Sequence, residues 1–410
     1  MDEIKPLTLL CLASNFKGAT FMQAAKQAGC RVLLIARESH ASENWPRESI
    51  DEIFFMPDLR KHPDIIYAVS YIARSHAIDQ IIALDDYDVE TAGALRDHLR
   101  LPGMGETQAR HFRDKLAMRM LTQAAGIPVP EFTPVFNYDR LRDFMERVPP
   151  PWLLKPRSEA SAMGITTINH PDEIWPVLDR LGDEQSFHLL ERFVPGDVFH
   201  VDGLVQAGEL IFAEVHRYGR PPMSVYQGGG VFVTRTLERD SPAYKSLVTL
   251  NRRVLKALGG AAAKLSPAGL RGATHVEYIR SHADGKFYFL ECASRVGGAN
   301  IAEMVEFATG LNLWAEWAKI EAAYLRGESY QLPEARREYA GVMNCLARQE
   351  YPDLSGYTDP EVVWRMQKKQ HAGLILASPD SQRLQSLLDE YSRRFAEDFL
   401  AVMPPMEKAV

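Results

Sequence analysis

The chain has 410 residues, a formal net charge of −7 and a hydrophobic share of 46%. At roughly 150 residues per domain, this length predicts two to four packed units, and the ordinary composition argues against a disordered or fibrous protein. The acidic balance does not favour a broad nucleic-acid-binding face or attachment to an anionic membrane surface.

The N-terminus carries Asp2 and Glu3 before a short apolar run, whereas a signal peptide begins with basic residues. No window of about 20 apolar residues follows, so the sequence predicts no bilayer-spanning helix. The four cysteines show no close metal-ligand spacing. So few cysteines in a long chain are typical of a reducing compartment, and we expect a cytoplasmic protein.

Short apolar runs alternate with helical patterns over the first hundred residues. Strands separated by helices are typical of a parallel α/β sheet, whose ligands bind beyond the carboxyl ends of the strands. The loops at 14–18 and 85–88 are therefore candidate binding loops, with solvated turns as the alternative. The predicted strands cover residues 7–12, 31–35, 52–56 and 80–84, and the predicted helices cover 19–28 and 65–75.

The rest of the chain has the pattern of an α+β region. Asp284-Gly285 is a strong hairpin signal and predicts that strand 275–280 pairs with strand 286–292. From about residue 332 a smaller unit is expected, with strands at 341–347 and 372–376 and a helix at 381–395. Between these regions the expected helices are 108–125 and 244–258, and the expected strands are 152–155, 191–205, 209–215 and 231–237.

Several segments carry residue types that suit a nucleotide and a metal ion. Two separated lysines, Lys115 and Lys155, can each neutralise a phosphate as a point charge. The small-residue loop after Lys155 can offer backbone N–H groups to phosphate oxygens. Glu277 and Glu291 fall on the two strands of the predicted hairpin, where side chains on one face lie within about 5 Å of each other.

A buried carboxylate pair is costly unless a cation lies between its members, and Mg²⁺ takes one or two carboxylates plus phosphate oxygens. Arg295, four residues after Glu291, can supply a planar fork for an oxyanion. The structural alternatives are a buried arginine partner for each glutamate and a structural salt bridge for Arg295. His275 is expected to be a hydrogen-bonded core histidine, and Asp202 a turn or edge residue.

With these motifs the sequence resembles the ATP-grasp superfamily, over roughly residues 1–330. The resemblance implies a mixed α/β and α+β fold in which two lobes clamp ATP. It also implies a Rossmann-like N-terminal domain (1–106), a small lobe with a lid loop (107–187), a large lobe with the metal site (188–330) and a small C-terminal α+β unit (331–410).

The resemblance also assigns roles to individual residues. In the family, two lysines contact the ATP phosphates, a flexible loop covers these phosphates, and a hinge binds adenine. Two carboxylates hold Mg²⁺, with Mn²⁺ as the alternative. An arginine stabilises the transferred phosphoryl group and the acyl phosphate. The matching positions here are Lys115 and Lys155; the loop 158–164 with Ser158, Ser161 and Gly164; Glu191, Phe193 and Val194; Glu277 and Glu291; and Arg295.

Two positions and one loop depart from the family pattern. Ala293 stands where the family has asparagine, which removes one side-chain ligand to a second magnesium ion. Val198 stands where the family has a glutamate that contacts ribose, so Asp197 or His200 is the expected replacement. The loop that corresponds to the lid has a single glycine, Gly164.

The resemblance is to the carboxylate–amine ligase branch, near the amino-acid ligases and biotin carboxylases. We expect an ATP-dependent ligase that forms an amide through an acyl phosphate, with amino acids as candidate substrates. Two alternatives stay open: another ATP-grasp reaction, such as bicarbonate-dependent carboxylation or phosphotransfer, and a nucleotide-binding regulatory subunit without turnover. The expected partners are small-molecule carboxylates and amines, with no nucleic acid and no membrane, and the resemblance favours a homodimer.

Overall fold

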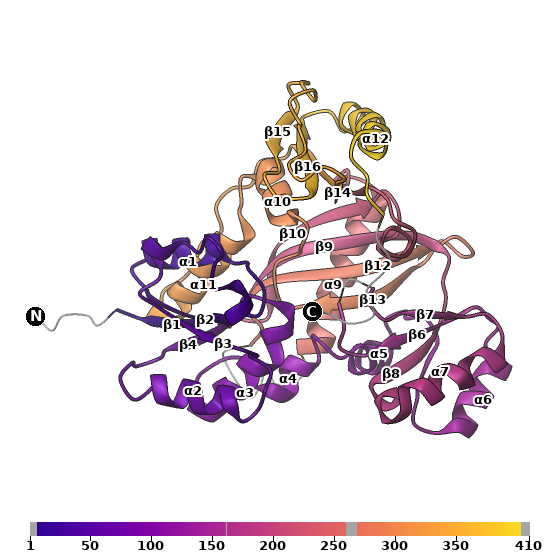
Figure 1. The fold of residues 1–410 in the computed structure, drawn as a ribbon, viewed down its shortest axis with the longest axis horizontal. Coiled ribbons are helices and arrows are strands. Elements are labelled where there is room, and N and C mark those ends of the chain that lie inside the picture. The colour runs from indigo at the N-terminus through magenta and orange to yellow at the C-terminus, as the bar shows by residue number, and fades with distance from the viewer. Residues whose placement is uncertain (1–5, 161, 260–268, 403–410) are drawn as a thin grey trace, which may run out of the picture.

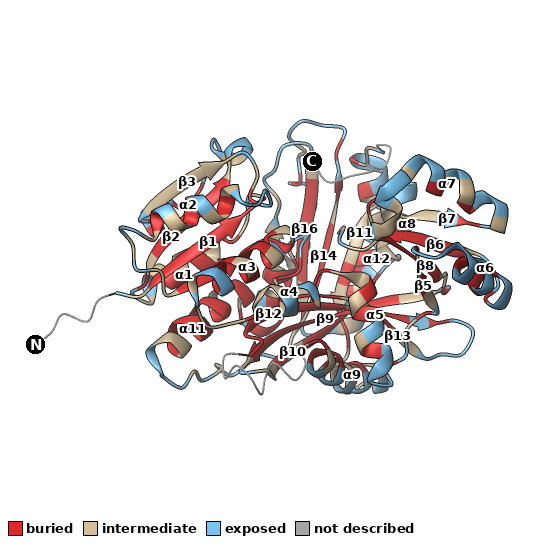
Figure 2. Ribbon diagram, turned by 90° about the horizontal axis from the view of Figure 1, so that it is seen from below, coloured by how far each residue is buried: buried red, intermediate tan, exposed pale blue. Residues whose placement is uncertain are grey.

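The computed structural model describes residues 6–160, 162–259 and 269–402, and these form three sheets (Figure 1). A parallel sheet lies at the N-terminal side, an eight-stranded antiparallel sheet runs through the centre, and a small antiparallel sheet lies on the opposite side. Buried residues occupy most strands of these sheets, whereas the strands at 52–56 and 362–365 contain none (Figure 2). None of the described helices is both long enough and apolar enough to cross a membrane.

The N-terminal sheet confirms the predicted parallel α/β unit. Its order is β3-β2-β1-β4, and every pairing is parallel. All residues of β1 are buried, as expected for a parallel sheet covered on both faces. The strands are β1 (Thr8–Ala13), β2 (Arg31–Arg37), β3 (Glu52–Met56) and β4 (Gln80–Ala83), and the helices are α1 (Ala19–Gln27), α2 (Asp64–Ile72), α3 (Val89–Leu99) and α4 (Glu106–Arg110).

The small lobe is a four-stranded antiparallel sheet of order β5-β8-β6-β7. Trp152, with no exposed surface, is at the centre of its core. The strands are β5 (Phe132–Pro134), β6 (Trp152–Pro156), β7 (Thr166–Ile168) and β8 (His188–Arg192), and the helices α6 (Tyr138–Arg147) and α7 (Ile174–Leu181) contribute to the core.

The central sheet has the order β13-β12-β9-β10-β11-β14-β16-β15. Because β14 pairs with β11, the C-terminal strands extend this sheet. Its strands are β9 (Gly196–Gln206), β10 (Glu209–Tyr218), β11 (Phe232–Thr236), β12 (Gly272–Ser281), β13 (Phe287–Ala293), β14 (Tyr339–Leu346), β15 (Val362–Arg365) and β16 (His371–Ser378). The remaining helices are α5 (Lys115–Ala124), α8 (Pro222–Gly228), α9 (Pro242–Gly259), α10 (Ile301–Thr309), α11 (Leu313–Arg326) and α12 (Ser381–Asp398).

The two faces of the central sheet differ in chemistry. Side chains alternate between the faces of a strand, so residues two apart share a face. Phe199, Val201 and Val276 pack in one core with α9 residues such as Leu247. The intervening residues, which include His200, Asp202, His275 and Glu277, therefore lie on the opposite face, and this face carries the ionisable groups of the site.

Two predicted elements were wrong because each spans a break in the chain. The helix predicted over 108–125 is two helices, α4 and α5, and Asp114 restarts the second. Its carboxylate accepts hydrogen bonds from the backbone N–H of Leu116 and Ala117, as an N-cap does. The strand predicted over 191–205 is also two, β8 and β9, separated by Pro195, which has no N–H to donate to a ladder.

Candidate active site

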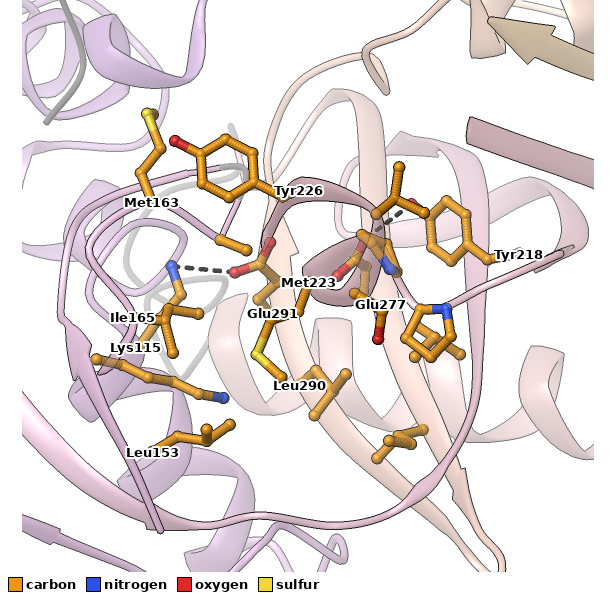
Figure 3. A pocket seen from close by; sticks show the side chains of 18 of the residues that line it. Lys115, Leu153, Met163, Ile165, Tyr218, Met223, Tyr226, Glu277, Leu290 and Glu291 are labelled. Atoms are coloured by element: carbon orange, nitrogen blue, oxygen red, sulfur yellow. Dashed lines mark hydrogen bonds and ion pairs between the residues drawn. The ribbon is translucent and has the colours of Figure 1, made fainter. Parts of the chain in front are cut away.

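A cavity of about 450 Å³ lies between the small lobe and the central sheet. Its wall includes most of the predicted site residues, which come from segments far apart in the sequence (Figure 3). The predicted residues that line it are Lys115, Lys155, Glu191, Phe193, Val194, Glu277, Glu291 and Arg295.

Glu277 and Glu291 lie opposite each other on β12 and β13. They are direct partners in the antiparallel register, and both line the cavity (Figure 3). Oε1 of Glu277 accepts a hydrogen bond from the Tyr218 hydroxyl at 2.7 Å. Oε2 of Glu277 has no hydrogen-bond or ion-pair partner within the described residues. Both carboxylates therefore face the same cavity from neighbouring strands.

The electrostatic environment keeps Glu277 ionised. Burial alone would raise its pKa, but hydrogen bonding from His275 and Tyr218 outweighs burial and holds the pKa below its usual value. Two opposed carboxylates, one with an unpartnered oxygen, are the oxygen donors that Mg²⁺ prefers. The residues present therefore fit a divalent cation that also contacts a phosphate.

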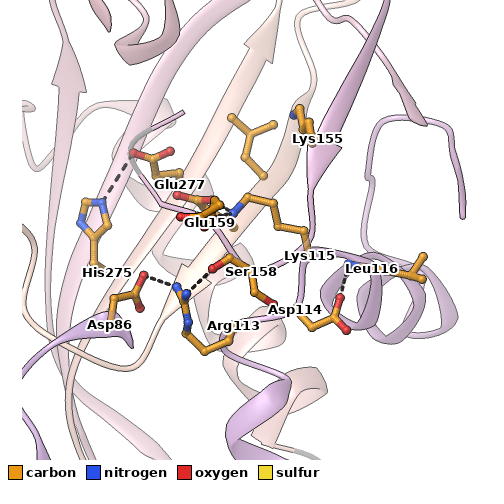
Figure 4. A network of polar contacts seen from close by, with 12 residues as sticks. Asp86, Arg113, Asp114, Lys115, Leu116, Lys155, Ser158, Glu159, His275 and Glu277 are labelled. Atoms are coloured by element: carbon orange, nitrogen blue, oxygen red, sulfur yellow. Dashed lines mark hydrogen bonds and ion pairs between the residues drawn. The ribbon is translucent and has the colours of Figure 1, made fainter. Parts of the chain in front are cut away.

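Lys115 is the first residue of α5, directly after the Asp114 cap. Its Nζ lies 3.0 Å from Oε2 of Glu291 and donates a hydrogen bond to the backbone carbonyl of Glu159 at 2.5 Å. Arg113 donates to the backbone carbonyl of Ser158 (Figure 4). Two neighbouring cations therefore hold the first residues of the loop at 158–164 against the core.

Lys155 belongs to a buried charge triad. Its Nζ donates to Oε1 of Glu191 at 2.6 Å, and Nε of Arg119 donates to Oε2 of the same carboxylate at 2.6 Å. Glu191 is only 1% exposed. Burial would raise its pKa, but Arg119 and Lys155 hold it below the usual value. Glu191 therefore anchors Lys155 at the cavity wall, in addition to lying on the predicted hinge.

The other predicted nucleotide contacts divide by position. Phe193 and Val194 line the cavity in the segment between β8 and β9. Ser158 and Gly164 lie in the loop beside the cavity, with Gly164 at φ +68°, but neither lines it. Ser161 lies outside the described residues.

Neither predicted replacement for the ribose contact lines the cavity. Asp197 forms an ion pair with Arg217 at 3.0 Å, with both side chains more than two-fifths exposed. His200 has no exposed surface; Nδ1 lies 2.5 Å from Asp202 and Nε2 lies 2.6 Å from Thr234. Val198, at the family's glutamate position, does line the cavity. A ribose contact from Asp197 or His200 is therefore not supported by this geometry.

Arg295 connects the cavity to the N-terminal unit. Its Nε lies 3.7 Å from Oδ1 of Asp86, which follows β4. Asp86 also accepts a hydrogen bond from Arg113 at 2.5 Å. Burial would raise the pKa of Asp86, but Arg113 and Arg295 outweigh it and lower the pKa. The predicted loop at 85–88, at the carboxyl end of the parallel sheet, therefore contacts the site through Asp86.

Comparison with solved structures identifies the fold. An L-amino acid ligase from Bacillus licheniformis matches 98% of this chain and 99% of its own at a TM-score of 0.75 and 16% identity. The ADP complex of N5-carboxyaminoimidazole synthetase from Staphylococcus aureus matches 96% of this chain and 98% of its own, at a TM-score of 0.71 and 14% identity. This chain has the ATP-grasp fold.

Curated sequences point the same way, although no family model matches the chain. The L-arginine-specific L-amino acid ligase of Bacillus subtilis is 24% identical over 273 residues, which cover 64% of this chain and 62% of the relative. A D-alanine–D-alanine ligase of Neisseria gonorrhoeae is 23% identical over 209 residues, 48% of this chain and 64% of the relative. Both alignments span less than two-thirds of the relative's length.

The cavity and its surroundings contain functional candidates that the sequence analysis did not identify. Arg119 lies four residues after Lys115, hence on the same face of α5, and this spacing was an available signal. Tyr218 had no such signal, because its contact with Glu277 crosses β9. The prediction for Asp202 was wrong: it is fully buried within the central sheet. His275 is buried and hydrogen-bonded as predicted, but it also lines the cavity rather than lying wholly in the core.

Proposed function

We propose that this protein is an ATP-dependent carboxylate–amine ligase that forms an amide through an acyl phosphate and releases ADP and phosphate. The observation that carries the proposal is the opposed pair Glu277 and Glu291, together with Lys115, Lys155 and Arg295 in one cavity. The fold and the named activities of the relatives, which are amino-acid ligases, support the same reaction class.

The charges of the cavity suit transfer of the γ-phosphoryl group. Lys115 and Lys155 would neutralise phosphate oxygens, and Arg295 would face the transferred group and the substrate carboxylate. A Mg²⁺ ion held by Glu277 and Glu291 would supply further neutralisation of the phosphates. Positioning and fixed electrostatic stabilisation carry most of the catalytic effect in such transfers.

The loop at 158–164 is proposed to close over the nucleotide. Its first residues are held by Lys115 and Arg113, so the start of the loop is fixed near the phosphate site. Closure over a charged site excludes water, which would otherwise hydrolyse an acyl phosphate.

Amino acids are the proposed substrates, as either the acid or the amine, because the relatives are named for amino-acid ligation. The test is an ADP-release screen over pairs of acids and amines, followed by mass spectrometry of the product. We expect ADP release to require both components. ADP release with acid alone, or none with any pair, would contradict the proposal.

Two further arms of the screen address the alternatives. ADP formation that depends on bicarbonate would indicate a carboxylase. Tight ATP binding without turnover on any pair of substrates would indicate a regulatory subunit. Ala293 supports this alternative, because it replaces the asparagine that serves as a metal ligand in the family. A homodimer remains part of the proposal and is tested by light scattering of the purified chain.

A further inference from the structure

One oxygen of Glu277 is held by two donors. The Tyr218 hydroxyl donates to Oε1 at 2.7 Å, and Nε2 of His275 lies 3.5 Å from the same atom (Figures 3 and 4). These side chains come from β10 and β12, on either side of β9. The contacts with Tyr218 and His275 both involve Oε1 of Glu277. Among the described residues, Oε2 of Glu277 has no hydrogen-bond or ion-pair partner.

The donor His275 is itself fixed by Asp202. Its Nδ1 lies 2.9 Å from Oδ1 of Asp202, its direct register partner on β9. Asp202 has no exposed surface, and His200 lies 2.5 Å from its other oxygen. An ionised carboxylate only accepts hydrogen bonds, so Nδ1 of both imidazoles carries a proton. Nε2 of His275 faces a second carboxylate, that of Glu277, and it donates there as the doubly protonated imidazolium. The ring of His275 is thereby oriented with Nε2 toward Glu277.

Tyr218 is also oriented by packing. Its ring lies 4.6 Å from the ring of His200, centroid to centroid, and 5.6 Å from that of Phe232. The Tyr218 hydroxyl lies 2.7 Å from Oε1 of Glu277, and an ionised carboxylate only accepts hydrogen bonds, so the phenol is the donor of this contact.

The same cluster contains potential ligand atoms of His200, Asp202 and His275 within 4.8 Å of one another, but its spacing is that of hydrogen bonds. Two ligands on zinc bonds of 2.0–2.1 Å in tetrahedral geometry lie about 3.3 Å apart. The histidine nitrogens here lie 2.5 and 2.9 Å from the Asp202 oxygens. The carboxylate therefore contacts both imidazoles directly, with no space for an ion between them.

We infer that Tyr218 and the Asp202–His275 pair are positioning residues that hold Glu277 by Oε1 and reserve Oε2 for the metal ion of the nucleotide. This inference rests on the proposed function, since it takes Glu277 as a metal ligand. Partners that orient a ligating carboxylate from behind are worth about 10- to 100-fold in metal affinity.

The test measures Mn²⁺ binding by the full-length chain in the presence of a non-hydrolysable ATP analogue. The electron paramagnetic resonance signal of free Mn²⁺ reports how much of the ion stays unbound. Y218F removes one hydroxyl and keeps the ring, and H275Q removes the second donor. H216Q is the matched control, because buried His216 also contacts Asp202, at 3.1 Å, but within the described residues it forms no hydrogen bond or ion pair with Glu277. Circular dichroism and thermal unfolding establish that each variant is folded.

We expect Y218F and H275Q each to weaken Mn²⁺ binding by about 10- to 100-fold, and H216Q to leave it unchanged. If H275Q does not fold, Y218F decides alone. Wild-type affinity in Y218F, or an equal loss in H216Q, would overturn the positioning role. Stoichiometric zinc in the purified protein would also overturn it. Absence of Mn²⁺ binding in the wild type would instead refute the metal site of the proposed function, and the inference with it.

Discussion

The triad of Glu191 with Arg119 and Lys155 allows a quantitative prediction for E191Q. Both cations contact the carboxylate at 2.6 Å, and the side chains of Arg119 and Glu191 are each 1% exposed. Glutamine keeps the shape of the side chain, but its neutral amide can accept from one cation and turns an N–H₂ group toward the other. Breaking a buried ion pair by removing one partner costs about 3–5 kcal/mol, because a buried charge is left uncompensated.

We therefore expect E191Q to lower the free energy of unfolding by about 3–5 kcal/mol in urea titrations followed by circular dichroism. The control is D64N, which removes the exposed pair of Asp64 with Lys61, whose side chains are 46% and 69% exposed. Exposed pairs contribute at most about 1 kcal/mol, so D64N should cost no more than that. A loss in E191Q no larger than that in D64N would refute the assignment of a tightly coupled buried triad.

Three further predictions address the site and its supports. E291Q should lower turnover by at least about 100-fold in steady-state ADP release, because it removes a fixed charge at the phosphate site, and near-wild-type turnover would contradict this. D114A and D114N both lose the ion pair of Asp114 with Arg157, but asparagine retains the helix cap, so D114A should lower the unfolding free energy by about 1–2 kcal/mol more than D114N; equal losses would argue against capping. Burial, followed by the neighbouring Asp85, raises the pKa of Asp88 from 3.8 to about 7, although hydrogen bonds from Ser14 partly oppose the increase. Between these two pH values the folded state therefore holds a proton on Asp88 that the unfolded state releases. Relative to D88N, the thermal midpoint of the wild type should therefore fall as the pH rises from about 4 to about 7, and a constant difference would contradict the shift.

Much of the fold follows from local sequence patterns. The buried strands β1 and β2 are continuous apolar runs, and Asp284-Gly285 marks the turn between β12 and β13. The breaks at Asp114 and Pro195 were misjudged because apolar periodicity continues across them. Short strands such as β5 and β7 were missed because three residues carry too little pattern, and their pairing partners stabilise them.

The site was predictable only where chemistry restricts the residue type. Lysines and glutamates at motif positions suit phosphate and metal, so Lys115, Lys155, Glu277 and Glu291 could be proposed from the sequence. Asp202 and Tyr218 are proposed to act through neighbours on other strands, and such roles depend on register and on which face of the sheet the residues occupy. His200 was assigned to ribose from its sequence position, whereas in the structure it has no exposed surface because the rings of His216, Tyr218 and His275 pack around it.

The most direct test of the proposed chemistry is the fate of oxygen from the substrate carboxylate. The acid identified in the ADP-release screen is labelled with ¹⁸O at its carboxylate, and the phosphate released with its amine partner is analysed by ³¹P nuclear magnetic resonance. An acyl phosphate requires one labelled oxygen to appear in each phosphate formed. Unlabelled phosphate, released together with the amide, would contradict attack of the carboxylate on the γ-phosphorus.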